Sequence, residues 1–344
     1  MSKNCRLCGK KTFKKVIDFN RTPLVNSLIE RKDLDKKEKT YPLLVEQCQN
    51  CFLVQIVNPV DSHEIYQTQD YLYFTGDMPT TDSYFTEFAD ELKKFSHDFV
   101  VEIGSNDGTM LKHFPSRILG IDPSTNVVIR ALSKGIPTLS SGFNERNAGN
   151  IAREFGQADI LGGANCIAHI HDLHSLMRGM VILLKDNGVF WVECNYWGKM
   201  VENTNYSLIY HDHYSYFTLR NWIDIASRYD MEVFDAYVTP AQGGSLRIFA
   251  SKNKREKTER FNQLLESENL NNYETCKKYE KACLKEAKKL KETIEKIKNE
   301  GKTIAGYGAA AKGFSVLHLA KIDQRHLDYF VDDSPAKQGK YTPV

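Results

Sequence analysis

The stretch Val100-Val101-Glu102-Ile103-Gly104-Ser105-Asn106-Asp107-Gly108-Thr109-Met110-Leu111 decides the fold. Its apolar residues predict a buried strand, and its two glycines predict a tight turn that opens into a helix. A second strand, 118–121, leads into Asp122, twenty residues after Glu102. A carboxylate at this spacing can bind the ribose hydroxyls of a nucleoside cofactor. Glycine also serves steric needs in ordinary turns, so the glycines alone do not separate a cofactor site from a plain turn.

The chemistry of the turn indicates which cofactor to expect. In the pattern Gly-x-Gly-x-x-Gly, three glycines let a pyrophosphate sit on a helix N-terminus, and this chain departs from that pattern. S-Adenosylmethionine has no pyrophosphate, and a polar turn suits its amino-acid tail and its sulfonium charge. We therefore predict an S-adenosylmethionine site. Its predicted residues are Glu102, Gly104, Asn106, Asp107, Asp122, Pro123, Asn165 and His169.

After Asp122, helices and strands alternate along the chain. This βαβα order predicts a parallel sheet with helices on both faces, and ligands on such sheets bind at the carboxyl ends of the strands. The predicted helices span 126–134, 148–155 and 173–184, and the predicted strands span 136–139, 158–164 and 189–196, with a closing hairpin over 231–235 and 242–250. The predicted fold class is α/β, with a Rossmann-like S-adenosylmethionine methyltransferase domain at its centre.

A chain of 344 residues exceeds one ordinary domain. We predict a zinc-binding module over 1–80, a methyltransferase domain over 81–252, an amphipathic helical connection over 253–300 and a short Rossmann-like unit over 301–344. The formal net charge of +2 gives no reason to expect a nucleic-acid partner. The chain lacks an apolar run of about 18 residues and an N-terminal signal segment. We expect a cytoplasmic protein that is monomeric or weakly homo-oligomeric and has no membrane partner.

Two Cys-x-x-Cys pairs form the clearest ligand pattern. Cys5 and Cys8 make the first pair, and Cys48 and Cys51 make the second, forty residues after Cys8. Each pair places two thiolates on one turn, and four thiolates complete the tetrahedral shell of a structural zinc ion. Such a closed shell stabilises a fold and leaves no position for catalysis. Free or redox-active cysteines are the alternative.

The densest polar cluster in the chain is the segment 210–217, which holds Tyr210, His211, Asp212 and His213. A His-x-His pair could bind a metal ion, but no further ligands stand at an obvious spacing. A surface loop rich in aromatic residues is a second alternative. We favour an acid/base site, because histidine transfers protons near neutral pH and a neighbouring carboxylate or tyrosine can orient it or stabilise an oxyanion.

Further polar and aromatic residues are candidates for a substrate pocket. The aromatic run 65–76 includes Tyr71 and Tyr73, and it could form core or a pocket wall. We favour the pocket wall, because a buried tyrosine hydroxyl needs a hydrogen-bond partner. Asn195 and Tyr196 end the strand 189–196 at the same rim as the cofactor residues, so we count them as candidate substrate residues.

Two sites could recognise phosphate. Arg247 alternates with apolar neighbours after a glycine pair, so it should face away from the core, where it could clamp a phosphate or be an ordinary surface arginine. The segment 302–313 is a second strand-glycine-helix unit, and its small residues and Lys312 suit an anion. Tyr307 lies in the same turn. The segment between Arg247 and the strand-glycine-helix unit carries a stripe of apolar residues that predicts one amphipathic helix. The stripe consists of Cys283, Ala287, Leu290, Ile294 and Ile297.

Taken together, these motifs resemble the S-adenosylmethionine-dependent sugar C-methyltransferase family, whose members act on nucleotide-linked 4-keto-6-deoxy sugars. The resemblance covers nearly the whole chain. It rests on the two cysteine pairs and on the segments 102–108, 120–124, 210–213, 243–247 and 307–313. It implies a zinc-binding N-terminal module, a central cofactor domain and a C-terminal Rossmann-like domain, with the sugar nucleotide bound between them.

The resemblance also implies catalytic roles. His213 matches the family's base, which removes the proton beside the keto group so that the enolate carbon attacks the sulfonium methyl. Tyr210 and Asp212 would orient this base or stabilise the enolate. His169 matches the histidine of the family's Asn-x-x-x-His stretch. The family's site also takes a tyrosine from the aromatic run, and either Tyr71 or Tyr73 could supply it. We count Tyr73 among the candidate catalytic residues and Tyr71 among the candidate substrate residues, and the choice between them stays open.

The sequence departs from the family in three places. Asp212 stands where the family has Glu, and the segment 74–78 lacks the family's serine pair, which leaves the identity of the substrate open. Similar proteins continue past Pro343, so we expect the C-terminal unit to be shortened. Methylation of a sugar oxygen or nitrogen is one alternative function, and non-catalytic binding of a sugar nucleotide is another.

Overall fold

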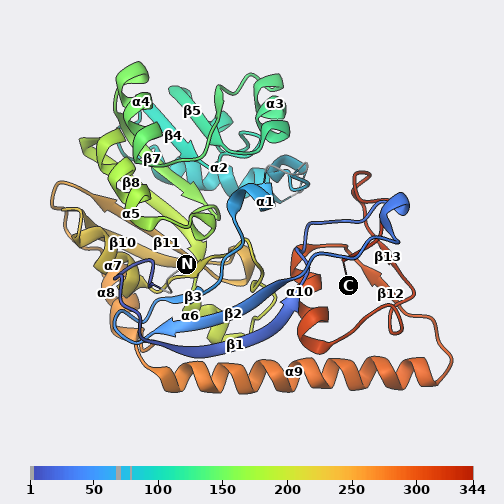
Figure 1. Ribbon diagram of the computed structural model, residues 1–344. Helices are drawn as coiled ribbons and strands as arrows, with labels where there is room; N and C mark the ends of the chain where they lie inside the picture. The colour runs from blue at the N-terminus through green and yellow to red at the C-terminus, as the bar shows by residue number, and fades with distance from the viewer. Residues whose placement is uncertain (1–3, 67–70, 78–79, 344) are drawn as a thin grey trace.

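A seven-stranded sheet forms the centre of the computed structural model, which describes residues 4–66, 71–77 and 80–343 (Figure 1). The strand order is β10-β11-β8-β7-β4-β5-β6, and only β11 runs antiparallel to its neighbours. The strands are β4 (Phe99–Ile103), β5 (Arg117–Asp122), β6 (Thr138–Ser140), β7 (Ala158–Ala164), β8 (Leu184–Asn195), β10 (Glu232–Thr239) and β11 (Ser245–Ser251). This sheet confirms the predicted α/β fold and brings the carboxyl ends of β4, β5, β7 and β8 to one edge.

Helices cover the sheet because each carries an apolar face. They are α2 (Thr81–Leu92), α3 (Thr125–Ser133), α4 (Glu145–Phe155), α5 (Leu173–Leu183), α7 (Leu219–Ser227) and α8 (Glu259–Ser267). Phe88 of α2, for example, packs edge-on against Trp191 of β8 with ring centroids 4.7 Å apart. The helix expected after Thr109 is reduced to one 3-10 turn, Leu111–His113, since positive φ angles at Gly104, Asn106 and Gly108 keep the backbone in consecutive turns.

A second sheet of four antiparallel strands lies beside the central one. It contains β1 (Phe13–Thr22), β2 (Tyr41–Cys48), β3 (Val54–Ile56) and β9 (Ser215–Tyr216). Its last strand comes from the middle of the chain, because Val54 pairs with Tyr216 and Gln55 pairs with Ser215. The polar segment 210–214 therefore lies directly before a strand of the N-terminal sheet. Two short helices, α1 (Ser62–Tyr66) and α6 (Trp197–Glu202), flank this junction.

The long helix α9 (Tyr273–Asn299) runs along one side of the molecule and leads to the C-terminal unit (Figure 1). Its predicted apolar stripe is confirmed, since Cys276, Cys283, Ala287 and Ile294 are buried. The C-terminal unit contains β12 (Ala305–Tyr307), α10 (Ala311–Ala320) and β13 (Tyr329–Val331), and the two strands pair in parallel as expected of a strand-glycine-helix unit. No helix among the described residues is both long enough and apolar enough to cross a membrane.

Candidate active site

The four cysteines of the N-terminal module meet at one point. Their Sγ atoms all lie within 4.8 Å of one another, with Cys5 and Cys51 3.4 Å apart and Cys8 and Cys48 3.5 Å apart. Tetrahedral zinc with Zn–S bonds of about 2.3 Å needs sulfur atoms about 3.8 Å apart, so these four thiols fit the ion. Because all four positions of the shell are filled by sulfur, zinc here would hold the module together and take no part in catalysis.

Polar groups without partners gather where the parallel strands end. Glu102 is the penultimate residue of β4 and is buried, and its Oε2 has no hydrogen-bond partner among the described residues. The same holds for Ser105 Oγ and Asn165 Oδ1. Burial raises the pKa of Glu102 well above its usual range, and the nearby carboxylates of Asp122 and Asp107 add to this effect. Buried polar atoms are normally paired, so these atoms indicate the place of a polar ligand.

The first turn of the sheet packs closely against the loop that follows β7. Gly104 has φ 64°, and a Cβ at this position would lie 2.4 Å from the Cβ of Cys166. Asp122, at the end of β5, is held in place because its two carboxylate oxygens accept the backbone N–H groups of Asn106 and Ser124. Pro123 follows it and is half-buried. The turn, Asp122 and the unpaired atoms therefore fit the predicted S-adenosylmethionine site.

Two of the predicted cofactor residues have other partners. The side chain of Asn106 accepts the N–H of Thr75 and donates to the carbonyl oxygen of Tyr73, and Asp107 accepts the N–H of Gly76. These bonds attach the segment 71–77, here called the strap, to the cofactor turn. In this structure the side chains of Asn106 and Asp107 bind the strap, and their contact with the cofactor stays a prediction.

His213 lies at the centre of the polar cluster, and its ring has a defined tautomer. Its Nδ1 lies 2.6 Å from the carbonyl oxygen of Leu208, which can only accept a hydrogen bond, so Nδ1 carries the proton and Nε2 keeps its lone pair. Asn195 Nδ2 lies 3.3 Å from the same Nδ1. The ring centroid of Tyr210 lies 4.1 Å from that of His213. Burial lowers the pKa of His213 to about 4, so the ring is neutral at physiological pH.

His169 joins this cluster, together with a tyrosine that we did not predict as a site residue. The ring centroids of His169 and His213 lie 4.8 Å apart, and the Tyr66 hydroxyl lies 2.6 Å from His169 Nδ1. Burial raises the pKa of Tyr66 and lowers that of His169, so the phenol keeps its proton and the imidazole is neutral. The other ring nitrogen of His169, Nε2, is buried and has no partner in the described structure. Tyr66 is the first tyrosine of the aromatic run 65–76, and the density of tyrosines in this run is the only sequence feature that could have indicated a site residue there.

Asp212 lies among tyrosines. Burial raises its pKa to about 7, and Asn26 Nδ2 lies 3.4 Å from its Oδ2. Tyr71 belongs to this cluster, since its ring lies 5.6 Å from that of Tyr66 and its pKa is raised by burial and, secondarily, by the Asp212 charge. Tyr73 is 43% exposed. The structure thus brings Tyr71 into the cluster and leaves Tyr73, the predicted catalytic tyrosine, on its margin.

Lys312 of the C-terminal unit also approaches the cluster. Its Nζ bonds to Oε1 of Gln242, and its positive charge contributes to the lowered pKa of His213. A cleft of 650 Å³ is lined by Glu202, Asn203, Thr204, Asn205, Tyr206, Ser207, Gly243, Glu286 and Val316. Gly243 directly follows Gln242, the partner of Lys312, in the chain.

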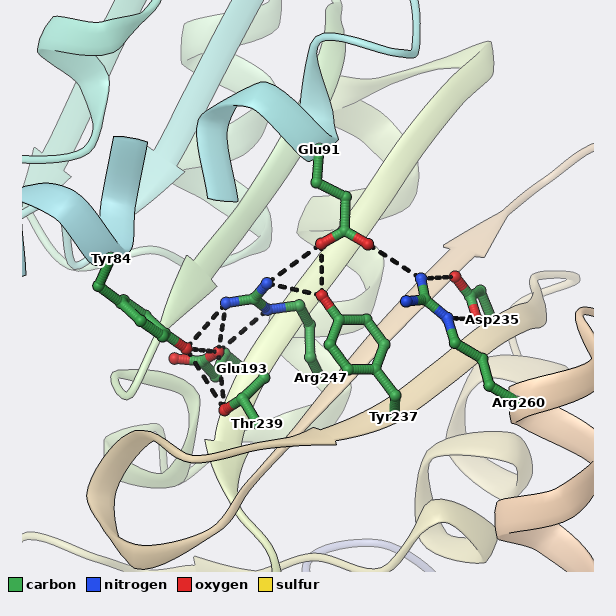
Figure 2. A network of polar contacts seen from close by, with 8 residues as sticks. All are labelled: Tyr84, Glu91, Glu193, Asp235, Tyr237, Thr239, Arg247 and Arg260. Carbon is green, nitrogen blue, oxygen red and sulfur yellow. Dashed lines mark hydrogen bonds and ion pairs between the residues drawn. The ribbon is translucent and has the colours of Figure 1, made fainter. Parts of the chain in front are cut away.

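Arg247 does not face solvent, contrary to our expectation. It is 5% exposed, and its guanidinium lies between two carboxylates, 2.7 Å from Glu193 Oε2 and 3.1 Å from Glu91 Oε2 (Figure 2). Its Nη1 and Nη2 also bond to the hydroxyl groups of Tyr237 and Tyr84. Both earlier interpretations, a phosphate clamp and a surface arginine, are therefore wrong: the side chain is buried in an ion network that joins α2 to the sheet.

Two other predicted substrate residues are also engaged elsewhere. Tyr196 is 5% exposed, and its hydroxyl donates to Glu268, which in turn accepts the N–H of Leu219 at the start of α7. Tyr307 is 79% exposed on β12 and donates to Asp333. In the predicted phosphate turn, the Ala309 N–H already bonds to a carboxylate, that of Asp332. Of the residues predicted in this segment, Lys312 alone is placed toward the site.

Comparisons with known proteins agree with this arrangement. Three families match successive parts of the chain: a zinc binding domain over 5–66, a methyltransferase domain over 81–236 and the C-methyltransferase C-terminal domain over 240–344. The C-methyltransferase NovU of Streptomyces niveus is 28% identical over 351 residues, which cover 98% of this chain and 83% of that protein.

Solved methyltransferase structures overlap with half of the chain. One is an S-adenosylmethionine-dependent methyltransferase of Clostridium acetobutylicum (10% identity, 52% of this chain, 94% of that chain, TM-score 0.40). Another is the magnesium protoporphyrin IX methyltransferase of Synechocystis PCC 6803 with bound S-adenosylmethionine (11% identity, 50% and 78%, TM-score 0.37). Because both TM-scores are below 0.5, the assignment rests on the three families and on NovU. This chain belongs to the family of S-adenosylmethionine-dependent C-methyltransferases that carry an N-terminal zinc-binding domain.

Proposed function

We propose that this protein methylates a carbon atom beside the ketone of a nucleotide-linked 4-keto-6-deoxy sugar, with His213 as the base. The observation that carries this proposal is the fixed tautomer of His213. The Leu208 carbonyl holds the Nδ1 proton, which leaves the Nε2 lone pair as the acceptor in the cluster. A neutral imidazole with a free lone pair can accept a carbon-bound proton.

The reaction needs a base, a place for negative charge and an electrophile. His213 Nε2 takes the proton from the carbon beside the ketone, and the electrons of that C–H bond form the enolate. S-Adenosylmethionine, which the edge with Glu102 and Asp122 would hold, would supply the electrophilic methyl group. The enolate carbon would bond to this methyl group as the carbon–sulfur bond broke, and the electron pair of that bond would stay on sulfur.

We assign the stabilisation of the enolate to His169. If Tyr66 donates to Nδ1, the His169 proton is on Nε2, which has no partner among the described residues and belongs to a ring beside that of His213. A pre-oriented donor in a buried site lowers the free energy of a developing oxyanion and costs no reorganisation during the reaction. We infer that His169 Nε2–H binds the ketone oxygen and that Tyr66 holds its tautomer.

We assign the nucleotide part of the substrate to the cleft lined by Ser207 and Gly243. This cleft has a volume of 650 Å³, within the range of small-molecule sites, and these two residues directly precede Leu208 and follow Gln242, respectively, in the chain. Lys312, the partner of Gln242, provides a cation, and a cation can bind a phosphate of a nucleoside diphosphate. Membership in a C-methyltransferase family speaks against our alternative of oxygen or nitrogen methylation.

Isotope exchange tests the role of His213 apart from methyl transfer. Nucleoside-diphosphate-linked 4-keto-6-deoxy hexoses would be incubated with the enzyme in deuterium oxide and S-adenosylhomocysteine, and deuterium uptake would be followed by mass spectrometry. We expect uptake at one carbon beside the ketone with the wild type and a loss of about a hundredfold with His213→Asn. His211→Asn is the matched control, because Nε2 of His211 faces the Tyr41 carbonyl instead. Equal uptake by the wild type and His213→Asn would exclude His213 as the base.

A further inference from the structure

Arg6 lies between the two cysteines of the first zinc knuckle, and its side chain points inward. It is 9% exposed, and its guanidinium donates from Nη1 to the carbonyl oxygen of Tyr214 at 3.0 Å and from Nη2 to that of Ile56 at 2.8 Å. The guanidinium also lies 5.6 Å from the centre of the Tyr214 ring. One arginine therefore joins the knuckle to the residue that directly follows His213.

The backbone around His213 is fixed from two sides. On one side, the Tyr214 carbonyl accepts both Arg6 and the Ile56 N–H at 3.0 Å. On the other side, the Tyr214 N–H donates to the carbonyl oxygen of Ala168 at 2.8 Å, and Ala168 directly precedes His169. The backbone segments that carry His169 and His213 are thus hydrogen-bonded to each other, and Arg6 connects them to the zinc-binding module.

The charge of Arg6 suits this position. The guanidinium group is buried, and Arg6 directly follows the ligand Cys5 in the chain. A zinc ion with four thiolate ligands would have a net negative charge at this place. A buried cation is tolerated where such an opposite charge lies close by. Zinc binding and the position of Arg6 should therefore support each other.

We propose that Arg6 is a positioning residue for methyl transfer: it transmits the fixed geometry of the zinc knuckle to the backbone of the catalytic base through the Tyr214 carbonyl. The inference rests on His213 as the base. Arg6 itself touches neither the substrate nor the cofactor. Its removal should leave the cofactor site at β4 and β5 intact and should slow catalysis by displacing His213, since small misplacements of reacting groups cost large factors in rate.

The test compares three full-length variants loaded with zinc. Arg6→Met removes both hydrogen bonds and the charge, Arg6→Lys keeps the charge and can donate to one carbonyl, and Lys11→Met is the matched control because Lys11 is exposed on the same module. For each variant, zinc content, affinity for S-adenosylmethionine by calorimetry, and kcat and KM with a nucleoside-diphosphate-linked 4-keto-6-deoxy hexose would be measured. Hydrogen exchange of peptides 208–217 and 158–164 would be followed by mass spectrometry.

We expect Arg6→Met to lower kcat by about tenfold to a hundredfold, with unchanged zinc content and cofactor affinity. Peptide 208–217 should exchange faster, peptide 158–164 should not, and Arg6→Lys should recover part of the rate. Unchanged kcat and exchange with zinc retained would overturn the inference. Loss of zinc and of cofactor binding would also overturn it, because Arg6 would then only support folding. If His213→Asn itself keeps full activity, the assignment of the base fails, whereas the exchange of peptide 208–217 still reports whether Arg6 holds the loop.

Discussion

Two buried polar regions in this protein differ in how their groups are paired. In the network around Arg247, all three guanidinium nitrogens have partners, on Glu193, Glu91, Tyr84 and Tyr237 (Figure 2). In the region at the ends of β4 and β7, buried atoms of Glu102, Ser105, Asn165 and His169 have no partner in the described structure. Both regions are rich in charge and tyrosine, so composition does not separate them.

The difference shows what separates a structural network from a ligand site. A guanidinium whose nitrogens are all paired offers a ligand no free donor, since any new bond must first break an existing one. An unpaired buried donor or acceptor costs free energy until a ligand binds it. We therefore propose that Glu102, Asn165 and His169 belong to the reaction site and that Arg247 belongs to the scaffold. The carboxylate of Glu193 is only partly paired, since its buried Oε1 has no partner among the described residues.

The largest expected effect is on stability, in the Arg247 network. Arg247→Met leaves the buried carboxylate of Glu193 without its cation, and breaking such a pair costs about 3–5 kcal/mol. Urea unfolding should show this loss, while the folded variant keeps its affinity for S-adenosylmethionine. Lys257→Met is the control, because that lysine forms an exposed ion pair with Glu232. If Arg247→Met loses affinity for S-adenosylmethionine but keeps its stability, Arg247 takes part in ligand binding and the structural role is wrong.

Acid should affect His213 and Asp212 in opposite directions. The pKa of His213 is lowered by burial to about 4, so its contribution to stability is present above the unfolded value of 6.5 and is lost as the pH falls toward 4. The pKa of Asp212 is raised to about 7, so its contribution is present below the unfolded value of 3.8 and is lost as the pH rises through 7.

Unfolding experiments at several pH values would measure both contributions as differences from variants. Between pH 7 and pH 4, the wild type should lose roughly 3 kcal/mol relative to His213→Asn, from a shift of about 2.5 units. Over the same range it should gain stability relative to Asp212→Asn. Parallel stability curves for wild type and both variants would contradict the assigned burial of these side chains.

Tyr66→Phe should have a smaller effect, on catalysis. Without the phenol, His169 Nδ1 loses its donor and the imidazole can place its proton on either nitrogen. We expect kcat to fall by about tenfold, which corresponds to about 1.4 kcal/mol, while KM and cofactor affinity stay close to those of the wild type. The His169→Phe and Tyr66→Phe changes should not be additive, because they act on one interaction. Additive losses would place Tyr66 outside the reaction site.

The smallest expected effect concerns Lys312. Its positive charge is the last of the causes that lower the pKa of His213, after burial, which dominates. Lys312→Gln should therefore raise the His213 pKa by less than about one unit, which NMR titration of the ring protons can measure. Lys321→Gln, an exposed substitution at the end of α10, is the control. A downward shift would contradict the placement of Lys312 beside the imidazole.

Much of the fold could be predicted from sequence because its signals are local. The cysteine pairs and the strand that contains Glu102 are short patterns, and both lie where expected. The environment of Arg247 could not be predicted, since its carboxylate partners Glu91 and Glu193 are 156 and 54 residues away in the chain. Tyr66 and His169 are 103 residues apart in the chain, and a contact over this distance produces no repeating pattern in the sequence from which it could be predicted.

The pairing of β3 with β9 has a consequence for how the protein folds. The N-terminal sheet, whose first three strands end by Ile56, stays incomplete until residues 215 and 216 have been synthesised, because they form its fourth strand. Closing so long a loop is entropically costly, and an unpaired strand edge is exposed in the meantime. The first 66 residues, although a recognisable family unit, should therefore fold poorly and associate when expressed alone. The zinc-binding module and the polar segment 210–214 should therefore form together, in one late and cooperative step of folding.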